Sequence, residues 1–422
     1  MSAVIDRLLD GEAAAPEAET EIRAAVNRMG KVALQTFIQA RIDHDDAQRV
    51  TPPGLVNHGR RSLWVRSTLG DFQVSRNYYR RAAGGPGAAP ADGILGLWRS
   101  YTPAMARVLC KLTAQLPFEA AADLLRDLTP TSVNGREFHR VAAEAADAAR
   151  HWVDHLAPPG KAPETLYVNF DGVGVPMRKE CLQGRRGRAD DGQARTREVR
   201  LACVFTQTKT DRRKKPRRDP ASTTYLASLC SADVFGPQVK AEAIRRGMAA
   251  ASRLVILSDG AHWCTKLAAT CFPGYLHILD FYHAAEHLHD LTVALFGDGD
   301  ESKTRFRAWR HDLRRGLAAD IIDKARSLLD QAKDQKEAEQ HIAYLSGNLP
   351  RMNYAQYRAA GLFIGSGVIE AGCKTIVAQR AKLSGMSWGE QGVQDVLTLR
   401  CLLFSGRFDL FWNHATAALR AA

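Results

Sequence analysis

The sequence contains no apolar run that approaches the length of a membrane span. A helix that crosses a bilayer needs about 18 to 20 consecutive apolar residues, and every apolar run in this chain is shorter. A secretory signal is also missing, because the N-terminal stretch GEAAAPEAETE is acidic and lacks a charged start followed by an apolar core. We therefore expect a soluble intracellular protein without a membrane partner.

Paired cysteines are absent as well. The eight cysteines show no CxxC or CxxxC spacing. This argues against a structural zinc site and against a disulfide framework, so we expect free and mostly buried thiols.

The chain has no internal repeat either. What it does have is ordinary globular composition, with 45% hydrophobic and 25% charged residues over 422 positions, which predicts two or three folded domains.

Positive charge is concentrated in one segment. The net charge is +12, and residues 178–218 contain 15 Lys or Arg against 5 Asp or Glu, an excess of +10 in 41 residues. A solvated, flexible loop is one explanation of such a run. A polyanion partner is the other, and it is favoured if an active site lies nearby. The candidate DNA-binding residues of this segment are Arg185, Arg186, Arg213, Lys214 and Lys215.

The N-terminal part alternates between helical and hairpin patterns. Residues 4–42 have apolar positions at helical spacing, and residues 61–80 alternate around a Leu-Gly-Asp turn, which predicts a β-hairpin. Residues 82–93 are rich in Gly and Pro and predict a loop. Three helical patterns follow over 102–147, with a break that resembles a helix-turn-helix. Simple helix packing explains these three helices equally well.

Beyond the break PPGKAP at 158–163, the pattern changes from helical to alternating. Five segments predict strands: 166–176, 199–207, 223–230, 253–261 and 275–283. Helices are expected at 239–250 and between the last two strands. Three strands, a helix, a strand, a helix and a strand is the order of an RNase H-like domain, a mixed sheet with helices on its faces. From about 284 to 345 the chain is helical and charged.

Two aspartates follow apolar strands in parallel fashion. Asp171 ends the first predicted strand and Asp259 ends a later one, 88 positions on, and each is followed by Gly. An Asp-Gly pair alone usually marks a turn. Two of them at the ends of buried strands suggest instead that neighbouring strands bring two carboxylates to one edge of the sheet.

Glu370 supplies a third carboxylate, just after Gly365, Ser366 and Gly367. In the first turn of a helix, a Glu is otherwise simply favourable for the helix dipole. Ser366 is a candidate helix cap. Three hard oxygen ligands suit Mg²⁺ or Mn²⁺, and two such ions in one active site support phosphodiester cleavage and strand transfer.

Several sequence blocks resemble bacterial insertion-sequence transposases of the ISKra type, which are related to the mutator-like group. The blocks are NFDGVGVP, SDGAHW, ILDFYHAAEHL, YRAAGLFIGSGVIEAGCKTIVAQRAKLSGMSW and LRCLLFSGRFDLFW. The resemblance covers about residues 60–415. It implies an RNase H-like domain interrupted by a helical insertion, with Asp171, Asp259 and Glu370 as the metal-binding triad. It also implies an Asp-x-x-His motif at Asp280 and His283.

Other residues near these blocks have two interpretations each. In one interpretation, His283 contacts phosphate or orients the leaving group; in the other, it is a packed histidine at a strand end. Further DNA-binding candidates are Lys374, Arg380 and Lys382, which fall on or just after the helix of Glu370; the alternative is a solvated helix face. Trp263 and Trp388 stack on an unpaired base or, more commonly for Trp, pack in the core.

The expected fold is a multidomain α/β chain. It has an RNase H-like mixed sheet with helices on both faces, interrupted by an all-α insertion and preceded by a mainly helical N-terminal DNA-binding region with a β-hairpin. The expected segments are 1–95 with the hairpin, 96–160 with the helix-turn-helix-like helices, 161–290 with the first catalytic part, 291–359 as the insertion, and 360–422 with the second catalytic part and C-terminal helices.

The expected function is that of an Asp-Asp-Glu transposase. It would cut DNA at the ends of an insertion sequence and join the freed 3′-hydroxyl to target DNA, with two Mg²⁺ or Mn²⁺ ions per site. Its partners would be double-stranded DNA, as terminal inverted repeats and target, and at least one further copy of the chain. The expected location is the bacterial cytoplasm at the nucleoid. The alternatives are a metal-dependent nuclease without strand transfer and a non-catalytic DNA-binding regulator derived from a transposase.

Overall fold

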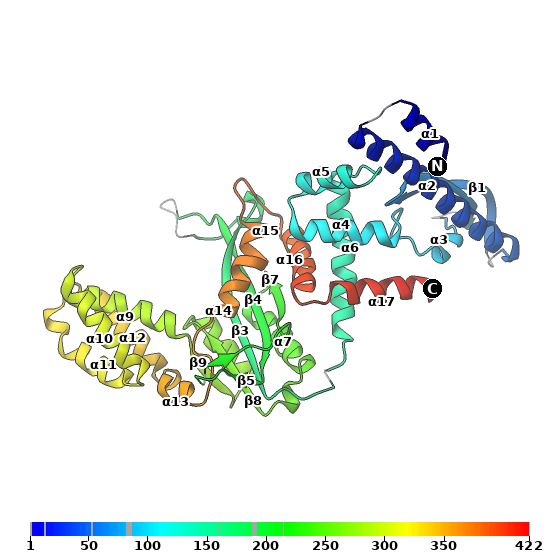
Figure 1. Ribbon diagram of the computed structural model, residues 1–422. Helices are drawn as coiled ribbons and strands as arrows, with labels where there is room; N and C mark the ends of the chain where they lie inside the picture. Colours follow the sequence, from blue (N-terminus) through cyan, green and yellow to red (C-terminus); the bar gives the residue numbers. More distant parts are fainter. Residues whose placement is uncertain are drawn as a thin grey trace. The chain divides into compact units, whose positions relative to one another are not determined.

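The computed structural model describes residues 2–11, 14–51, 54–81, 87–158, 160–187, 192–213 and 215–421. The chain divides into two compact units, Met1–Trp152 with Arg407–Ala422, and Val153–Gly406 (Figure 1). Among the described helices, none combines the length and the apolar character that a membrane span requires.

The first unit is mainly helical and contains one β-hairpin. Its elements are α1 (Ser2–Asp10), α2 (Ala15–Gln48), β1 (Leu55–Ser67), β2 (Gly70–Arg81), α3 (Ala91–Ile94), α4 (Pro103–Gln115), α5 (Phe118–Leu128), α6 (Gly135–Asp154) and α17 (Phe408–Ala421). The predicted hairpin is confirmed, and β1 and β2 pair antiparallel up to Ser67↔Gly70. Gly70 has φ +121°, a backbone conformation that favours glycine and so fixes the turn here.

One face of α2 packs on this hairpin. Ile38 and Ile42 of α2 form a buried cluster with Val65, Phe72 and Val74 of the two strands. The helix predicted over 4–42 is therefore present, but it is interrupted between α1 and α2.

The three helices predicted over 102–147 are present as α4, α5 and α6, and the last one runs further, to Asp154. The C-terminal helix α17 packs with α4 through an ion pair of Arg107 with Asp409 at 2.5 Å, and its Trp412 ring lies 5.3 Å from the ring of Trp98 in the segment before α4. The sequence had grouped 360–422 together, but the packing divides this segment after Gly406.

The second unit is built on a five-stranded mixed sheet of order β7-β4-β3-β8-β9 (Figure 1). Its strands are β3 (Thr165–Pro176), β4 (Thr196–Gln207), β7 (Thr224–Ser228), β8 (Arg253–Ser258) and β9 (Leu276–Leu279), and a small hairpin of β5 (Lys209–Thr210) and β6 (Pro216–Arg217) lies between β4 and β7 in the chain. β3, β4 and β7 pair antiparallel, whereas β3, β8 and β9 pair parallel. The chain is thus a mixed α/β protein with the predicted order of strands.

Helices cover both faces of the sheet. On one face, Phe170 of β3 and Ile256 of β8 form a buried core with α7 (Ala232–Arg245) and α8 (His262–Cys271). On the other face lie α14 (Gly367–Gly372), a π-helical segment Cys373–Ala378, α15 (Gln379–Ala381) and α16 (Glu390–Phe404). Gly372 permits this approach, because a Cβ there would lie 2.8 Å from the ring of Tyr225 on β7.

A group of helices lies between β9 and α14 in the chain. It consists of α9 (Phe281–Phe296), α10 (Asp300–Arg314), α11 (Ala318–Ser327), α12 (Gln335–Asn348) and α13 (Tyr354–Ala359). Figure 1 shows them beside one end of the sheet. The predicted all-α character of 291–359 is confirmed. The strand predicted over 275–283 was wrong in its second half, because β9 ends at Leu279 and α9 begins at Phe281.

A candidate active site where strands β3 and β8 part

Asp171 and Asp259 occupy matched positions on two neighbouring parallel strands. The ladder between β3 and β8 ends with the pair Phe170↔Ser258, and each aspartate is the next residue of its strand or loop. The prediction that Asp171 ends its strand was wrong, since β3 continues to Pro176 paired with β4. It is the partner strand β8 that ends, and this opens the edge of the sheet beside Asp171.

The Asp171 carboxyl group is mostly buried. Its Oδ1 accepts a hydrogen bond from the backbone N–H of Gly172 at 2.6 Å, and its Oδ2 accepts one from the Cys373 thiol at 3.4 Å. Burial is the largest influence and raises the pKa of Asp171; the charge of Asp259 raises it further, while these hydrogen bonds and His283 lower it. The net pKa is raised. Asp171 therefore lies near a second carboxylate in a poorly solvated place.

Asp259 begins the loop that leads into α8. Its Oδ1 accepts a hydrogen bond from the Ala261 N–H at 3.2 Å, which folds the chain back toward the helix. Gly260 lies against α12, since a Cβ there would be 2.2 Å from the Tyr344 hydroxyl. Burial first, and then the Asp259 charge, raise the pKa of Tyr344 to about 12. The helical segment therefore reaches this edge of the sheet.

Glu370 lies in the short helix α14. The Ser366 hydroxyl donates a hydrogen bond to Glu370 Oε1 at 2.6 Å. Ser366 occupies the N-cap position, but its side chain makes no capping hydrogen bond. The prediction that the Ser366 side chain caps this helix is therefore wrong. Burial, then Asp171 and further Glu370, raise the pKa of the Cys373 thiol.

Sequence reasoning missed Cys373. It follows Glu370 by three residues, a spacing that places both side chains on one side of a helix. The segment Cys373–Ala378 is π-helical, and such segments are frequent at functional sites. The i, i+3 spacing was therefore the available signal.

Asp280 connects two segments that are far apart in the sequence. Its side chain is fully buried. One carboxylate oxygen accepts a hydrogen bond from the Ser366 N–H, and the other accepts one from the His283 N–H at 2.7 Å. It thereby joins the start of α9 to the loop that precedes Glu370. The Asp-x-x-His spacing indicated these two residues but not this bridge.

His283 is only partly buried, with 37% of its side chain exposed. Its Nδ1 lies 3.3 Å from Glu286, and its charge lowers the pKa of Asp171. His283 therefore lies close enough to Asp171 to influence the pKa of that carboxyl group. The Glu286 side chain beside it is exposed.

The donor set suits a hard cation only in part. Asp171 and Asp259 are oxygen donors that repel one another, and a divalent cation between such groups would relieve this repulsion. In the described part of the chain, however, no three His, Cys, Asp or Glu side chains gather closely enough to hold a metal ion together. The pair therefore fits a cation, and Glu370 is not placed as its third ligand in this arrangement.

The basic residues near Glu370 differ in exposure. Lys374 and Lys382 are exposed. Arg380 is fully buried, and its guanidinium lies over the ring of Trp388 at 5.0 Å. The prediction that Arg380 contacts DNA phosphates is therefore wrong for this arrangement, because solvent does not reach the side chain. Trp388 is buried too and donates from Nε1 to the Ala381 carbonyl at 3.0 Å, which is a packing role.

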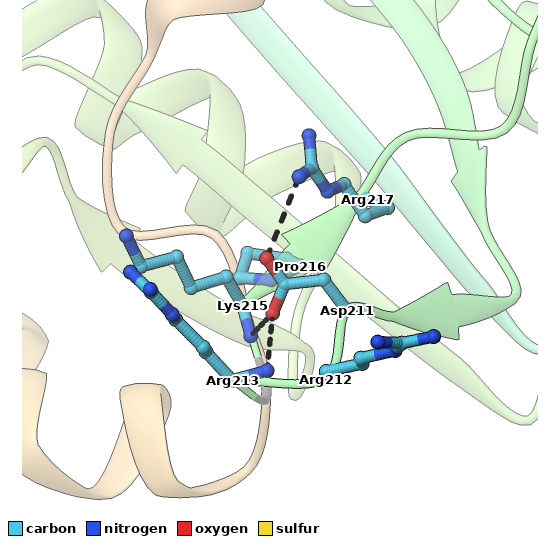
Figure 2. A pocket seen from close by; sticks show the side chains of 6 residues that line it. All are labelled: Asp211, Arg212, Arg213, Lys215, Pro216 and Arg217. Atoms are coloured by element: carbon cyan, nitrogen blue, oxygen red, sulfur yellow. Dashed lines mark hydrogen bonds and ion pairs between the residues drawn. The ribbon is translucent and has the colours of Figure 1, made fainter.

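A tight basic turn joins β5 and β6. Asp211 accepts hydrogen bonds from the N–H groups of Arg213 at 2.8 Å and Lys215 at 2.9 Å, and pairs with Arg217 at 3.5 Å. Figure 2 shows Asp211 at the centre of this turn with the cationic side chains around it. A hollow of about 550 Å³ is lined by Asp211, Arg212, Arg213, Lys215, Pro216 and Arg217. We call residues 211–217 the basic turn; Lys214 lies outside the described residues.

The remaining predicted DNA-binding residues lie in a second loop. Arg185 and Arg186 are exposed at the base of the loop between β3 and β4. Arg186 forms a β-bridge with Gln193, and the Ala194 N–H donates to the Arg185 carbonyl at 3.4 Å. Two short pairings are therefore present in the described parts of the basic segment, β5 with β6 and Arg186 with Gln193.

Comparison with known proteins gives a remote structural similarity. No protein-family model and no curated protein matches the chain. A solved structure that is similar to it is the Drosophila P element transposase strand transfer complex, with 11% sequence identity and a TM-score of 0.27, over 75% of this chain and 80% of that chain. A TM-score this low carries no conclusion about the fold or the activity of this chain.

Proposed function

We propose that this chain is an Asp-Asp-Glu transposase and that its second unit is an RNase H-like catalytic domain. The observation that carries the proposal is the matched position of Asp171 and Asp259 directly after the last parallel pair of β3 and β8. The sheet order, with an antiparallel half and a parallel half, supports the RNase H-like assignment. The sequence blocks that resemble ISKra-type transposases support the narrower family.

In this proposal, Asp171 and Asp259 hold the divalent cations, Mg²⁺ or Mn²⁺, and Glu370 completes the set when DNA is bound. The bound cations would activate an oxygen nucleophile and stabilise the leaving alkoxide. Ser366 and Asp280 fix the segment that carries Glu370. His283, which is partly exposed beside Asp171, contacts a DNA phosphate near the scissile bond.

The two reactions follow from the same set of residues. In cleavage, water attacks phosphorus at the element end and a 3′-hydroxyl leaves. In joining, that 3′-hydroxyl attacks phosphorus of the target DNA, and the target's own 3′ oxygen leaves. The carboxylates keep the same position in both steps, so the substrate and not the protein changes.

The basic turn is proposed to bind the DNA backbone, together with Arg185, Arg186, Lys374 and Lys382. Its cations are exposed and are held in a fixed turn by Asp211, which suits contact with successive phosphates. Base recognition is proposed for the helices α4 to α6 of the first unit, whose order is that of a helix-turn-helix region.

Neutralising the basic turn is expected to reduce the salt dependence of DNA binding. In the variant Arg213→Gln/Lys215→Gln, two phosphate contacts are lost, so the slope of log K against log salt should decrease in magnitude by about 1.8. Fluorescence anisotropy with a labelled duplex at several salt concentrations measures this slope. The matched control is Lys303→Gln/Arg307→Gln on α10, which removes the same charge from an exposed helix. Equal slopes for the two variants would remove the basic turn from the DNA interface.

The deciding experiment combines a labelled duplex that carries the chain's own element end with a supercoiled target. The protein is incubated with Mg²⁺, with Mn²⁺ and with a chelator. Metal-dependent cutting together with joined product supports the transposase. Cutting without joining supports a nuclease, and tight binding without any metal-dependent product supports a non-catalytic regulator.

A further inference from the structure

Helix α2 is apolar on two opposite sides. Its inner side packs on the hairpin through Ile38 and Ile42, which are 7% and 0% exposed. Helical residues are separated by 100° around the axis, so residues about half a turn away from this side face outward. A helix that served only to cover the hairpin would carry polar residues there.

The outward side carries large apolar side chains instead. Ile22, Val26 and Met29 are 36%, 48% and 57% exposed, and Val32 and Phe37 beside them are 57% and 63% exposed. We call the following residues the outer seam: Ile22, Val26, Met29, Ala33, Thr36 and Ala40. Their spacing alternates as four, three, four, three and four residues, which is the pattern by which two helices pair along their length.

Residue size along the outer seam indicates which way a partner helix runs. The first three positions are large (Ile22, Val26 and Met29), and the last three are small (Ala33, Thr36 and Ala40). An antiparallel second copy places Ile22 opposite Ala40, and each large residue opposite a small one. A parallel copy would set large against large at one end and leave gaps between small residues at the other.

The flanks of the seam agree with such pairing. Val32 and Phe37 widen the apolar surface on its two sides, and Gly30 adds no charge. Antiparallel packing also places the positive end of each helix dipole beside the negative end of the other, which is favourable. The seam from Ile22 to Ala40 is about 27 Å long at 1.5 Å per residue, which is enough for several layers of contact.

We propose that the outer seam of α2 is a self-association surface, on which a second copy of this chain packs antiparallel through its own α2. The arrangement has two-fold symmetry, so residue 22 of one copy meets residue 40 of the other and the reverse contact is identical. The proposal does not rest on the catalytic function, because it uses only residues of the first unit and requires no DNA.

The first test measures the oligomeric state of the full chain. Sedimentation velocity of nuclease-treated protein is compared for the wild type and for Val26→Glu/Met29→Glu. The wild type should dimerise, and the variant should dimerise at least about 100-fold more weakly, because its carboxylates would be moved out of water in the dimer. Both positions are exposed, so the fold should be unaffected, and circular dichroism checks this. The matched control is Val50→Glu, at a valine that is 86% exposed just after α2, and it should dimerise as the wild type does.

The second test determines the direction of the partner helix. Under mild oxidation, Ile22→Cys/Ala40→Cys should form a covalent dimer, because a disulfide needs Cα atoms within about 7 Å. Ile22→Cys alone should not, and the wild type with its native thiols sets the background. Peptide mapping should locate the bond between residues 22 and 40.

Three results would overturn the proposal. They are a wild type that stays monomeric at every concentration, a dimer that the seam variant leaves unchanged, and a disulfide between the two copies of residue 22. The third would show a parallel arrangement.

Discussion

Replacing Asp171 or Asp259 with Asn is expected to lower metal-dependent DNA cleavage by about 1,000-fold, while binding to an element end stays within a few-fold of the wild type. Metal-ion catalysis supplies several kcal/mol of transition-state stabilisation, which corresponds to a factor of about this size. Asn keeps the shape of the side chain but loses the charge that, in the proposed function, holds a cation. Cleavage of a labelled duplex in single-turnover conditions measures the loss.

The control for this loss is Asp233→Asn. Asp233 is an exposed aspartate of α7 that pairs with Lys266 at 2.9 Å. It lies on an element of the same unit, and its replacement should leave cleavage unchanged. Retained cleavage in Asp259→Asn would remove Asp259 from the mechanism, and retained cleavage in Asp171→Asn would do the same for Asp171.

A second readout separates lost chemistry from lost folding in Asp171→Asn. Burial and the Asp259 charge raise the pKa of Asp171, so the folded chain disfavours the ionised form. Without divalent cations, the neutral Asn should therefore increase the free energy of unfolding at neutral pH. The increase is full above the raised folded-state pKa and disappears as the pH falls from that value to the lower unfolded-state pKa, because the wild-type carboxyl group is then protonated in both states. Denaturant titration in a chelating buffer measures this, and a loss of stability at neutral pH would contradict it.

The sheet of the second unit was predictable because its signals are local. Buried strands such as Leu166 to Phe170 are short apolar runs, and such runs are recognised from composition alone. The helix between β7 and β8 is a crossover of the kind that parallel strands need, whereas the sequence predicted β3 and β8 only as neighbours, and the structure shows that they pair parallel. That Asp171 and Asp259 lie at one edge of the sheet could therefore be predicted from the sequence.

The remaining parts of the site depend on contacts between distant segments. Whether Arg380 faces solvent or the core is decided by Trp388 and by the elements packed around them, and no local pattern contains this. The same holds for α17, which packs with α4 through residues about 300 positions away. The resemblance named Asp280 and His283, but the hydrogen bond from Ser366, 86 positions away, emerges only in three dimensions.

Replacing Asp280 with Ala is expected to lower the free energy of unfolding of the second unit by about 3 to 6 kcal/mol. Hydrogen bonds to a charged acceptor contribute about 1.5 to 3 kcal/mol each, and this carboxylate accepts two of them in a fully buried place. The buried N–H group of Ser366 and the partly buried N–H group of His283 would both lose their acceptor. Urea denaturation followed by far-UV circular dichroism measures the change.

Local hydrogen exchange identifies the cause of that loss. Peptides that contain Ser366 and peptides that contain His283 should exchange faster in Asp280→Ala, since Asp280 is the acceptor that both segments share. The matched control is Asp290→Ala, at an aspartate of the same helix whose side chain is 54% exposed, and it should change stability by less than about 0.5 kcal/mol. Equal effects of the two substitutions would contradict the bridge. Faster exchange at Ser366 together with slower cleavage would connect Asp280 to the position of Glu370, because Ser366 holds the Glu370 carboxylate.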